Sequence, residues 1–589
     1  MLLQKCDLRK PCQSCAGSNT DCEEYTPYLR QHRVERQYTD ALEEKLTILE
    51  SRVRELEERG RDTSPSFPTP IPVRSDYTRT LNTRRSSSSL TGYRSGGSPS
   101  SSTTPPFSAT PPQSYRTASG SPADVPSLVG FPYTGVSSTP GLEFFVSDPQ
   151  STIDIFIKNA PQLGFFLHPG RFREAALLPL APDHPAKPTV GLLATVYLWG
   201  VHLSDSRRRL ADDMLAVATK CVAADLATMS PLPRILLPLI QAHILLAYYF
   251  FQNGQFMEAK CYCGLAVNIA LGAGLHQICS NSKWSSLPMA TMAPTVLVAP
   301  RDDLEQGQII NAFWTVLVLH KLLAVALDPP SNVCGALEVT TLRIQTPWPF
   351  DLNVYSGNLQ PYSLTSNRSV IEGFLQGGSQ EYEEGNSALG LHAKGAILYH
   401  KAAQISGQLL DHHASMPETS RLAPEIALLE ANITNIRSKV PDLSHFDPVV
   451  HVETGTVMTT HALLDAAIIK LHSQFRNGHP PSMQKSLMAA TSLLERGSGM
   501  FVVYQSRVNP ILAILWRAAC EVLIDKIIQS DNAAPQSPSR VATTYSHPNH
   551  ELVEKLRNGM TVMTIHSDGN PLMKYQLSRV QDLYIEHIR

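Results

Sequence analysis

Four cysteines stand close together near the start of the sequence. Cys6, Cys12, Cys15 and Cys22 are separated by five, two and six residues, whereas the other six of the ten cysteines are scattered through the rest of the chain. Thiolates in such short loops can surround Zn²⁺ tetrahedrally. Because a unit of about 20 residues lacks a sizeable core, the bound metal would supply its folding energy, on the order of 10 to 16 kcal/mol. The spacing therefore predicts a zinc site.

Composition limits what these residues could do. The first ten residues, MLLQKCDLRK, contain no apolar leader, so we expect reduced thiols and not a disulfide framework. Fifty Lys+Arg against 52 Asp+Glu leave a formal charge of −2, so any attraction to nucleic acid must come from a local patch. The longest apolar run, 235–251, is interrupted by Pro238, Gln241 and His243 and predicts a buried helix, not a membrane span.

Residues 39–59 carry a heptad pattern. Leu46 and Val53 occupy a positions, and Leu42, Leu49 and Leu56 occupy d positions. The g positions are basic and the e positions are acidic, which allows ion pairs across a parallel two-stranded coiled coil. A single amphipathic helix docked on its own chain would explain the leucines but not the opposed charges. The pattern therefore predicts a parallel homodimer.

The remaining chain divides by composition. Residues 23–38 form a polar connector, and residues 60–141 are rich in Ser, Thr, Pro and Gly, which predicts a disordered linker. Its serines beside Arg84 and Arg85 are either phosphorylation sites or a plain spacer. Residues 142–530 show helical periodicity with few alternating strands and predict a large all-α domain, and 531–589 predict a loop and a helical tail.

Several helices can be placed within this apolar body. The segments 244–251 and 256–271, joined by a turn at Gly254, predict an antiparallel helix pair. Further helices are expected at 308–327, 393–410, 459–475, 510–528, 551–566 and 575–588. Cys261 and Cys263 fall two residues apart on a helix and therefore point in different directions, so we interpret them as core thiols. No motif typical of a catalytic site is found, and we expect no enzyme.

The stretch KCDLRKPCQSC, with the later Cys22, resembles the second half of the fungal binuclear zinc-cluster DNA-binding domain, in which six cysteines hold two zincs. The resemblance implies that Cys12 bridges both metals, with Cys15 and Cys22 on one zinc and Cys6 on the other. It also implies nuclear localisation, CGG-type half-sites in double-stranded DNA, and dimerisation through the coil at 39–59. The candidate DNA-contacting residues are Lys5, Arg9, Lys10, Arg30, Arg33 and Arg36.

The chain departs from this family before Cys6, where a first CxxC and a basic helix are expected but only four residues follow Met1. We therefore interpret residues 1–22 as a truncated zinc-cluster module that holds at most one zinc, against two per subunit in an intact member. A start site placed inside the motif, a missing upstream exon, or true loss of the reading helix would each explain the pattern. Six Lys+Arg against five Asp+Glu in 1–38 make a weak patch for DNA phosphates.

A second resemblance concerns the helical body. Segments 245–278 and 313–333 resemble the signature helices of the regulatory region of fungal transcription factors, through residues Gly254, Ala266, Gly274, Leu275, His276, Phe313, Trp314 and Pro330. His320 and Lys321 replace the usual acidic-basic pair, so we expect one surface polar contact of the family to differ here. The resemblance implies that transcription machinery or a small-molecule effector acts on this body; a plain helical-repeat scaffold is the other interpretation.

These observations favour a zinc-dependent, sequence-specific transcription factor that regulates RNA polymerase II transcription and lacks half of its DNA-reading motif. Two other classes stay open. One is a helical sensor or interaction protein that does not bind DNA and acts through dimerisation. The other is an enzyme on an α-helical scaffold, which would require perturbed titratable side chains in a pocket of residues 142–530.

Overall fold

The computed structural model describes residues 148–182, 184–204, 206–228, 235–278, 300–327, 337, 343–355, 370–377, 386–410, 421–443, 453–501, 508–533 and 549–588. The chain divides into two units, 1–126 and 127–589, and all of the described residues belong to the second unit. These residues form helices and connecting turns without any strand, which confirms the predicted mainly α fold.

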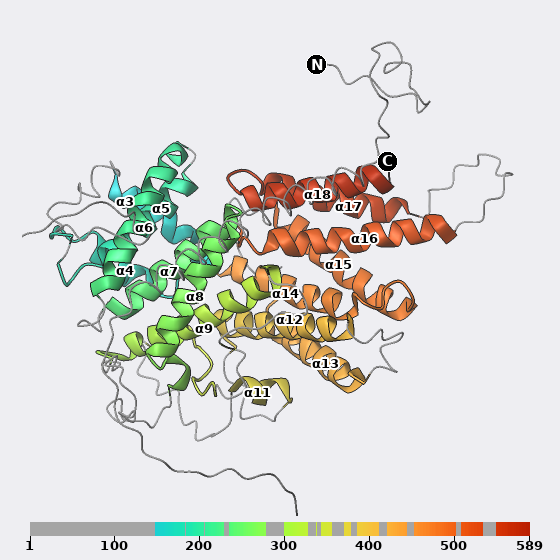
Figure 1. Cartoon of the computed structure of the whole chain (residues 1–589), viewed down its shortest axis with the longest axis horizontal. Coiled ribbons are helices and arrows are strands. Elements are labelled where there is room, and N and C mark those ends of the chain that lie inside the picture. The colour runs from blue at the N-terminus through green and yellow to red at the C-terminus, as the bar shows by residue number, and fades with distance from the viewer. Residues whose placement is uncertain are drawn as a thin grey trace, which may run out of the picture. The chain divides into compact units, whose positions relative to one another are not determined.

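The described residues in the first half of the unit form six helices and three short 3₁₀ turns. They are α3 (Pro149–Asn159), η2 (Ala160–Leu163), α4 (Pro169–Ala176), α5 (Val190–Leu203), η3 (Arg208–Leu210), α6 (Ala211–Thr228), α7 (Leu236–Gln252), α8 (Phe256–Gly272) and η5 (Leu275–Gln277). Consecutive helices pack as neighbours, α5 with α6 and α7 with α8. Figure 1 shows this half on the left, from cyan to green.

The second half consists of longer helices. They are α9 (Asp303–Leu327), α10 (Leu352–Tyr355), α11 (Val370–Leu375), α12 (Ala388–Leu410), α13 (Ala423–Lys439), α14 (Thr454–His472), α15 (Pro480–Phe501), α16 (Leu512–Ala533), α17 (His550–Ile565) and α18 (Pro571–His587). α12 packs along α14, α14 along α15, and α15 along α16. α17 and α18 lie against α15 and α16, so the last residues are part of the same packed body.

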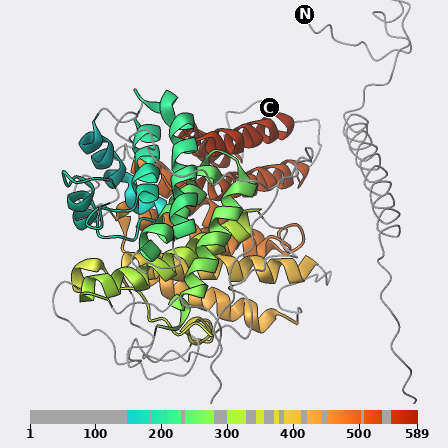
Figure 2. The same cartoon turned by 60° about the vertical axis from the view of Figure 1, so that its left-hand side comes forward.

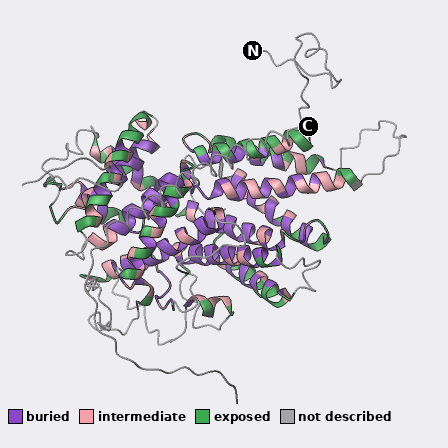
Figure 3. Cartoon of the chain, viewed as in Figure 1, coloured by how far each residue is buried: buried purple, intermediate pink, exposed green. Residues whose placement is uncertain are grey.

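α9 connects the two halves, because it packs against α8 on one side and α12 on the other. It is the one described helix that is long and apolar enough to cross a membrane, but 89% of its most apolar 18-residue window is buried inside the fold. Phe313 and Trp314 are fully buried there. Figure 3 shows buried residues concentrated on the central helices, and Figure 2 shows the same packing from a second side. We interpret α9 as the central core helix.

Local sequence signals explain where several helices begin. Asp148 caps α3 by accepting a 3.0 Å hydrogen bond from the Ser151 amide, and Pro149 follows at the first helical position. Asn570 and Pro571 start α18 in the same way, with a 3.0 Å bond from the Met573 amide. Gly254 adopts a φ of 77° in the turn between α7 and α8, a conformation that a side chain would disfavour.

The predicted helices are confirmed with small shifts at their ends. The predicted pair at 244–251 and 256–271 is α7 and α8, and the helix expected at 308–327 is α9, which begins five residues earlier. The apolar run 235–251 is the buried helix α7, as predicted. The interpretation of Cys261 as a core thiol is wrong, because it is exposed on α8 while Cys263 is buried. The placement of Lys321 at the surface is also wrong, because this side chain is buried.

Candidate functional sites

All of the residues that the sequence assigned to metal, DNA or dimer contacts lie outside the described residues. These are the zinc ligands Cys6, Cys12, Cys15 and Cys22, the basic residues Lys5, Arg9, Lys10, Arg30, Arg33 and Arg36, and the coil residues Leu42, Leu46, Leu49, Val53 and Leu56. Their donor chemistry is nevertheless clear from their types. Four thiolates fit the tetrahedral preference of zinc.

Most of the cysteines in the described residues are buried in the helical unit. Cys221, Cys263 and Cys520 are buried, and Cys261 is exposed. Burial raises the pKa of Cys263 and of Cys520 to about 12, because it penalises the thiolate. Within the described residues no group of three or more His, Cys, Asp or Glu side chains could hold a metal ion. The zinc expectation therefore rests on the first cysteines alone.

A buried carboxylate organises the contact between three helices. Asp465 on α14 is 2% exposed, and its two oxygens accept 2.6 Å bonds from Arg437 Nη2 on α13 and Arg496 Nη1 on α15. Ser492 Oγ donates a further bond of 3.1 Å to Asp465 Oδ2. Burial raises the pKa of Asp465, while the two guanidinium groups oppose that change. Two cations around one buried acid form a structural clamp.

A second group of hydrogen-bonded polar side chains joins α13, α14 and α15. His472 Nε2 lies 2.6 Å from Glu430 Oε1, and His472 Nδ1 lies 2.9 Å from Ser482 Oγ. Lys485 Nζ also donates to Glu430 Oε1, at 2.7 Å. The hydrogen bond from His472, followed by that from Lys485, lowers the pKa of Glu430 to about 2. Ser, His and Glu are the residue types found in catalytic triads. Ser482 is 0% exposed, however, so it cannot contact a substrate. We therefore interpret this group of hydrogen-bonded side chains as structural.

Cationic side chains are also buried near the centre of the unit. Lys394 on α12 lies over the Trp348 ring, with Nζ 4.9 Å from the ring centre, and Trp348 stacks on Trp314 at 4.3 Å. Burial lowers the pKa of Lys321 on α9 to about 7. Burial, followed by the charge of Lys321, lowers the pKa of His400 to about 2. None of these groups lines either of the two cavities described below.

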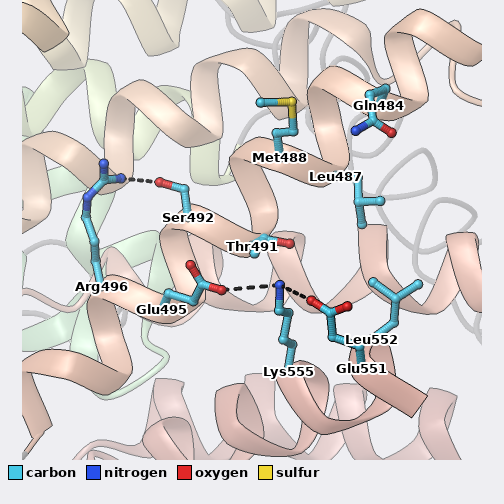
Figure 4. A pocket seen from close by; sticks show the side chains of 10 residues that line it. All are labelled: Gln484, Leu487, Met488, Thr491, Ser492, Glu495, Arg496, Glu551, Leu552 and Lys555. Carbon is cyan, nitrogen blue, oxygen red and sulfur yellow. Dashed lines mark hydrogen bonds and ion pairs between the residues drawn. The ribbon is translucent and has the colours of Figure 1, made fainter. Parts of the chain in front are cut away.

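The described cavities lie between α15 and α17. The larger one encloses about 520 Å³ and is lined by Gln484, Leu487, Met488, Thr491, Ser492, Glu495, Arg496, Glu551, Leu552 and Lys555. Figure 4 shows α15 side chains on one side and Glu551, Leu552 and Lys555 of α17 opposite them. Lys555 Nζ links the two helices through a 3.3 Å contact to Glu495 on α15, and it also contacts Glu551 on its own helix at 2.9 Å. No local pattern in the sequence marks this site, because its residues come from helices about 60 positions apart.

Comparison with known proteins gives a match near the start of the chain. Residues 4–32 match the model of the fungal Zn(2)-Cys(6) binuclear cluster domain. This match confirms the predicted zinc-cluster resemblance, and its span contains all four predicted zinc ligands together with Lys5, Arg9, Lys10 and Arg30. No curated protein and no solved structure matches the chain.

The matched family is a zinc-cluster domain of the kind that binds DNA in transcription factors. The match ends at residue 32, before Arg33, Arg36 and the heptad residues. The coiled coil at 39–59 and the resemblance of the helical unit to a fungal regulatory region therefore stay predictions. So do the proposed domain boundaries, including the division at residue 530.

Proposed function

We propose that this protein is a zinc-dependent, sequence-specific transcription factor that regulates RNA polymerase II transcription from the nucleus. The observation that supports it is the match of residues 4–32 to the fungal binuclear zinc-cluster domain, together with the thiolate set within those residues. A helical body of the size described here is suited to receiving a signal or binding a partner.

Each predicted residue has a role in this proposal. Cys6, Cys12, Cys15 and Cys22 hold at most one zinc per chain. Lys5, Arg9, Lys10, Arg30, Arg33 and Arg36 contact phosphates of double-stranded DNA with CGG-type half-sites, as the resemblance implies. Leu42, Leu46, Leu49, Val53 and Leu56 join two chains in parallel, and the connector 23–38 sets the distance between half-sites. Zinc, when bound, would fix the loop between Cys6 and Cys12, which carries Arg9 and Lys10.

Metal and DNA binding can be tested on the full chain. Cobalt added to the reduced protein is expected to give thiolate-to-metal absorption that saturates at about one ion per chain, which four thiolates can ligate. Cys12→Ser should reduce this absorption strongly, whereas Cys261→Ser, which changes an exposed thiol of α8, should leave it unchanged. A duplex with two CGG triplets should then be shifted by the zinc-loaded wild type at low salt, but not by Cys12→Ser.

A second candidate function is a helical sensor or interaction protein that dimerises without binding DNA. The heptad pattern at 39–59 would be sufficient for this function. Saturable cobalt binding without any DNA shift would support this candidate over the first. Absence of cobalt absorption would exclude the zinc site.

A further inference from the structure

The cavity between α15 and α17 continues into a second one of about 310 Å³, lined by Leu494, Glu495, Ser498, Glu551, Glu554, Lys555 and Asn558. The two cavities share Glu495, Glu551 and Lys555, so they form one furrow along α15 and α17. On α15 the furrow extends from Gln484 to Ser498, which corresponds to about 20 Å at 1.5 Å per residue. This length fits about four turns of a helix better than it fits a small molecule.

The larger cavity of the furrow contains a group of three apolar side chains. Met488 is 64% exposed, although most large apolar side chains of this unit are buried. Leu487 beside it and Leu552 on α17 are half-buried and line the same cavity (Figure 4). Exposed methionine adapts to different apolar surfaces because its chain is flexible and polarizable. These three side chains form an apolar surface at the bottom of the furrow, against which the apolar side of a helix can pack.

The rim of the furrow is acidic. Glu495, Glu551 and Glu554 are all exposed along it, and Glu551 is 78% exposed at its side chain. Lys555 is the cation of this rim, and it is already in contact with Glu495 and Glu551. The other lining cation, Arg496, is engaged by the buried Asp465. The rim therefore keeps a surplus of negative charge that is available to a partner.

We propose that this furrow binds a basic amphipathic helix of a partner protein, with the apolar stripe of that helix on Met488, Leu487 and Leu552 and its Lys or Arg side chains against Glu495, Glu551 and Glu554. The length of the furrow, its apolar floor and its acidic rim each match this one occupant. The proposal concerns the helical unit and does not depend on zinc or DNA binding.

The test uses the full chain and a synthetic probe. The probe is a fluorescein-labelled amphipathic peptide of about four helical turns, with Leu at i, i+4 and i+7 spacing and Arg on the flanks. Fluorescence anisotropy is expected to show saturable binding that weakens as salt rises. Met488→Asp should weaken binding at least about tenfold, the size of a hot-spot contact.

The matched control is Met257→Asp, because Met257 is 72% exposed on α8, where no described cavity lies. This variant should bind the peptide as the wild type does. Glu551→Gln provides a second variant in the furrow, and it should weaken binding and reduce its salt dependence. Circular dichroism and thermal melting verify that each variant is folded.

Three affinity results would each overturn the proposal. They are absence of binding to the wild type, equal loss of affinity in Met488→Asp and Met257→Asp, and equal binding of a peptide in which every Arg is replaced by Glu. A peptide with a photoreactive benzophenone in its apolar stripe should in addition crosslink to α15 or α17, and crosslinks confined to other helices would also contradict the proposal.

Discussion

Arg496 on α15 donates from Nη1 to Oδ2 of Asp465 on α14 across 2.6 Å, and Asp465 is 2% exposed. Arg437 on α13 contacts the other oxygen of the same carboxylate at the same distance. One buried charge is thus compensated by two helices that flank its own. Leaving a buried charge partly unpaired is costly, so these three residues are expected to hold α13, α14 and α15 together.

Arg496→Met tests this clamp. It removes a hydrogen bond to a buried charged group and should lower the free energy of unfolding by about 1.5 to 3 kcal/mol. Arg171→Met is the control, because it breaks an exposed ion pair with Asp302 and should cost less than about 1 kcal/mol. Urea unfolding followed by circular dichroism gives both values. If both variants lost the same small free energy of unfolding, the buried Asp465 would not need Arg496 for its stability.

The interaction of Glu430 with His472 and Lys485 predicts a pH dependence. The pKa of Glu430 is lowered to about 2 from the ordinary 4.5, because His472 and Lys485 stabilise the carboxylate in the folded state. The resulting stabilisation is fully present above the unfolded-state pKa and is lost as pH falls from about 4.5 towards 2. Glu430→Gln should therefore lower the melting temperature at about pH 6 and flatten its fall at acid pH.

Ser438→Ala, on the same helix as Glu430, should keep the wild-type slope of melting temperature against pH, because it removes only a bond from the Ser438 hydroxyl to the Asn435 carbonyl. If the melting temperature of Glu430→Gln fell at acid pH as much as that of the wild type, the assigned role of this carboxylate would be contradicted.

Two helical glycines give opposite predictions for the same substitution. A Cβ on Gly200 of α5 would collide with the carbonyl oxygen and side chain of Thr152 on α3, whereas a Cβ on Gly264 of α8 would meet nothing within 4 Å. Gly200→Ala should therefore destabilise the protein by about 1 to 3 kcal/mol. Gly264→Ala should stabilise it by up to about 1 kcal/mol, because alanine favours helix. Thermal melting of the two variants measures the contrast, and a neutral Gly200→Ala would disprove the close approach of α3 and α5.

The heptad at 39–59 predicts a dimer that a single charge can disrupt. Leu49→Glu at a d position should convert the full chain to a monomer, because it introduces a charge into the apolar seam. Glu44→Lys, at an outward f position of the same helix, should leave the dimer intact. Light scattering after size exclusion measures the mass of each variant. A monomeric wild type would exclude the proposed coiled coil.

Much of the fold could be predicted from periodicity. The helices α7, α8 and α9 were placed within a few residues of their ends, because each is long, apolar and limited by residues such as Gly254 that end a helix. Cys261 was assigned wrongly, because two residues on one apolar helix can face opposite environments. Lys321 was also assigned wrongly, because a lysine in an apolar run gives no sign of whether its turn of the helix meets solvent.

The sequence by itself determined the chemistry that depends on neighbours along the chain: the four closely spaced thiols, the heptad, and the position of about half of the described helices. Short-range spacing is sufficient for each of these. Only the tertiary structure decided which distant side chains meet, as in the clamp around Asp465 and the furrow between Met488 and Leu552. Those contacts depend on how helices cross and rotate against each other, which is set by packing of the whole core and leaves no local pattern in the sequence.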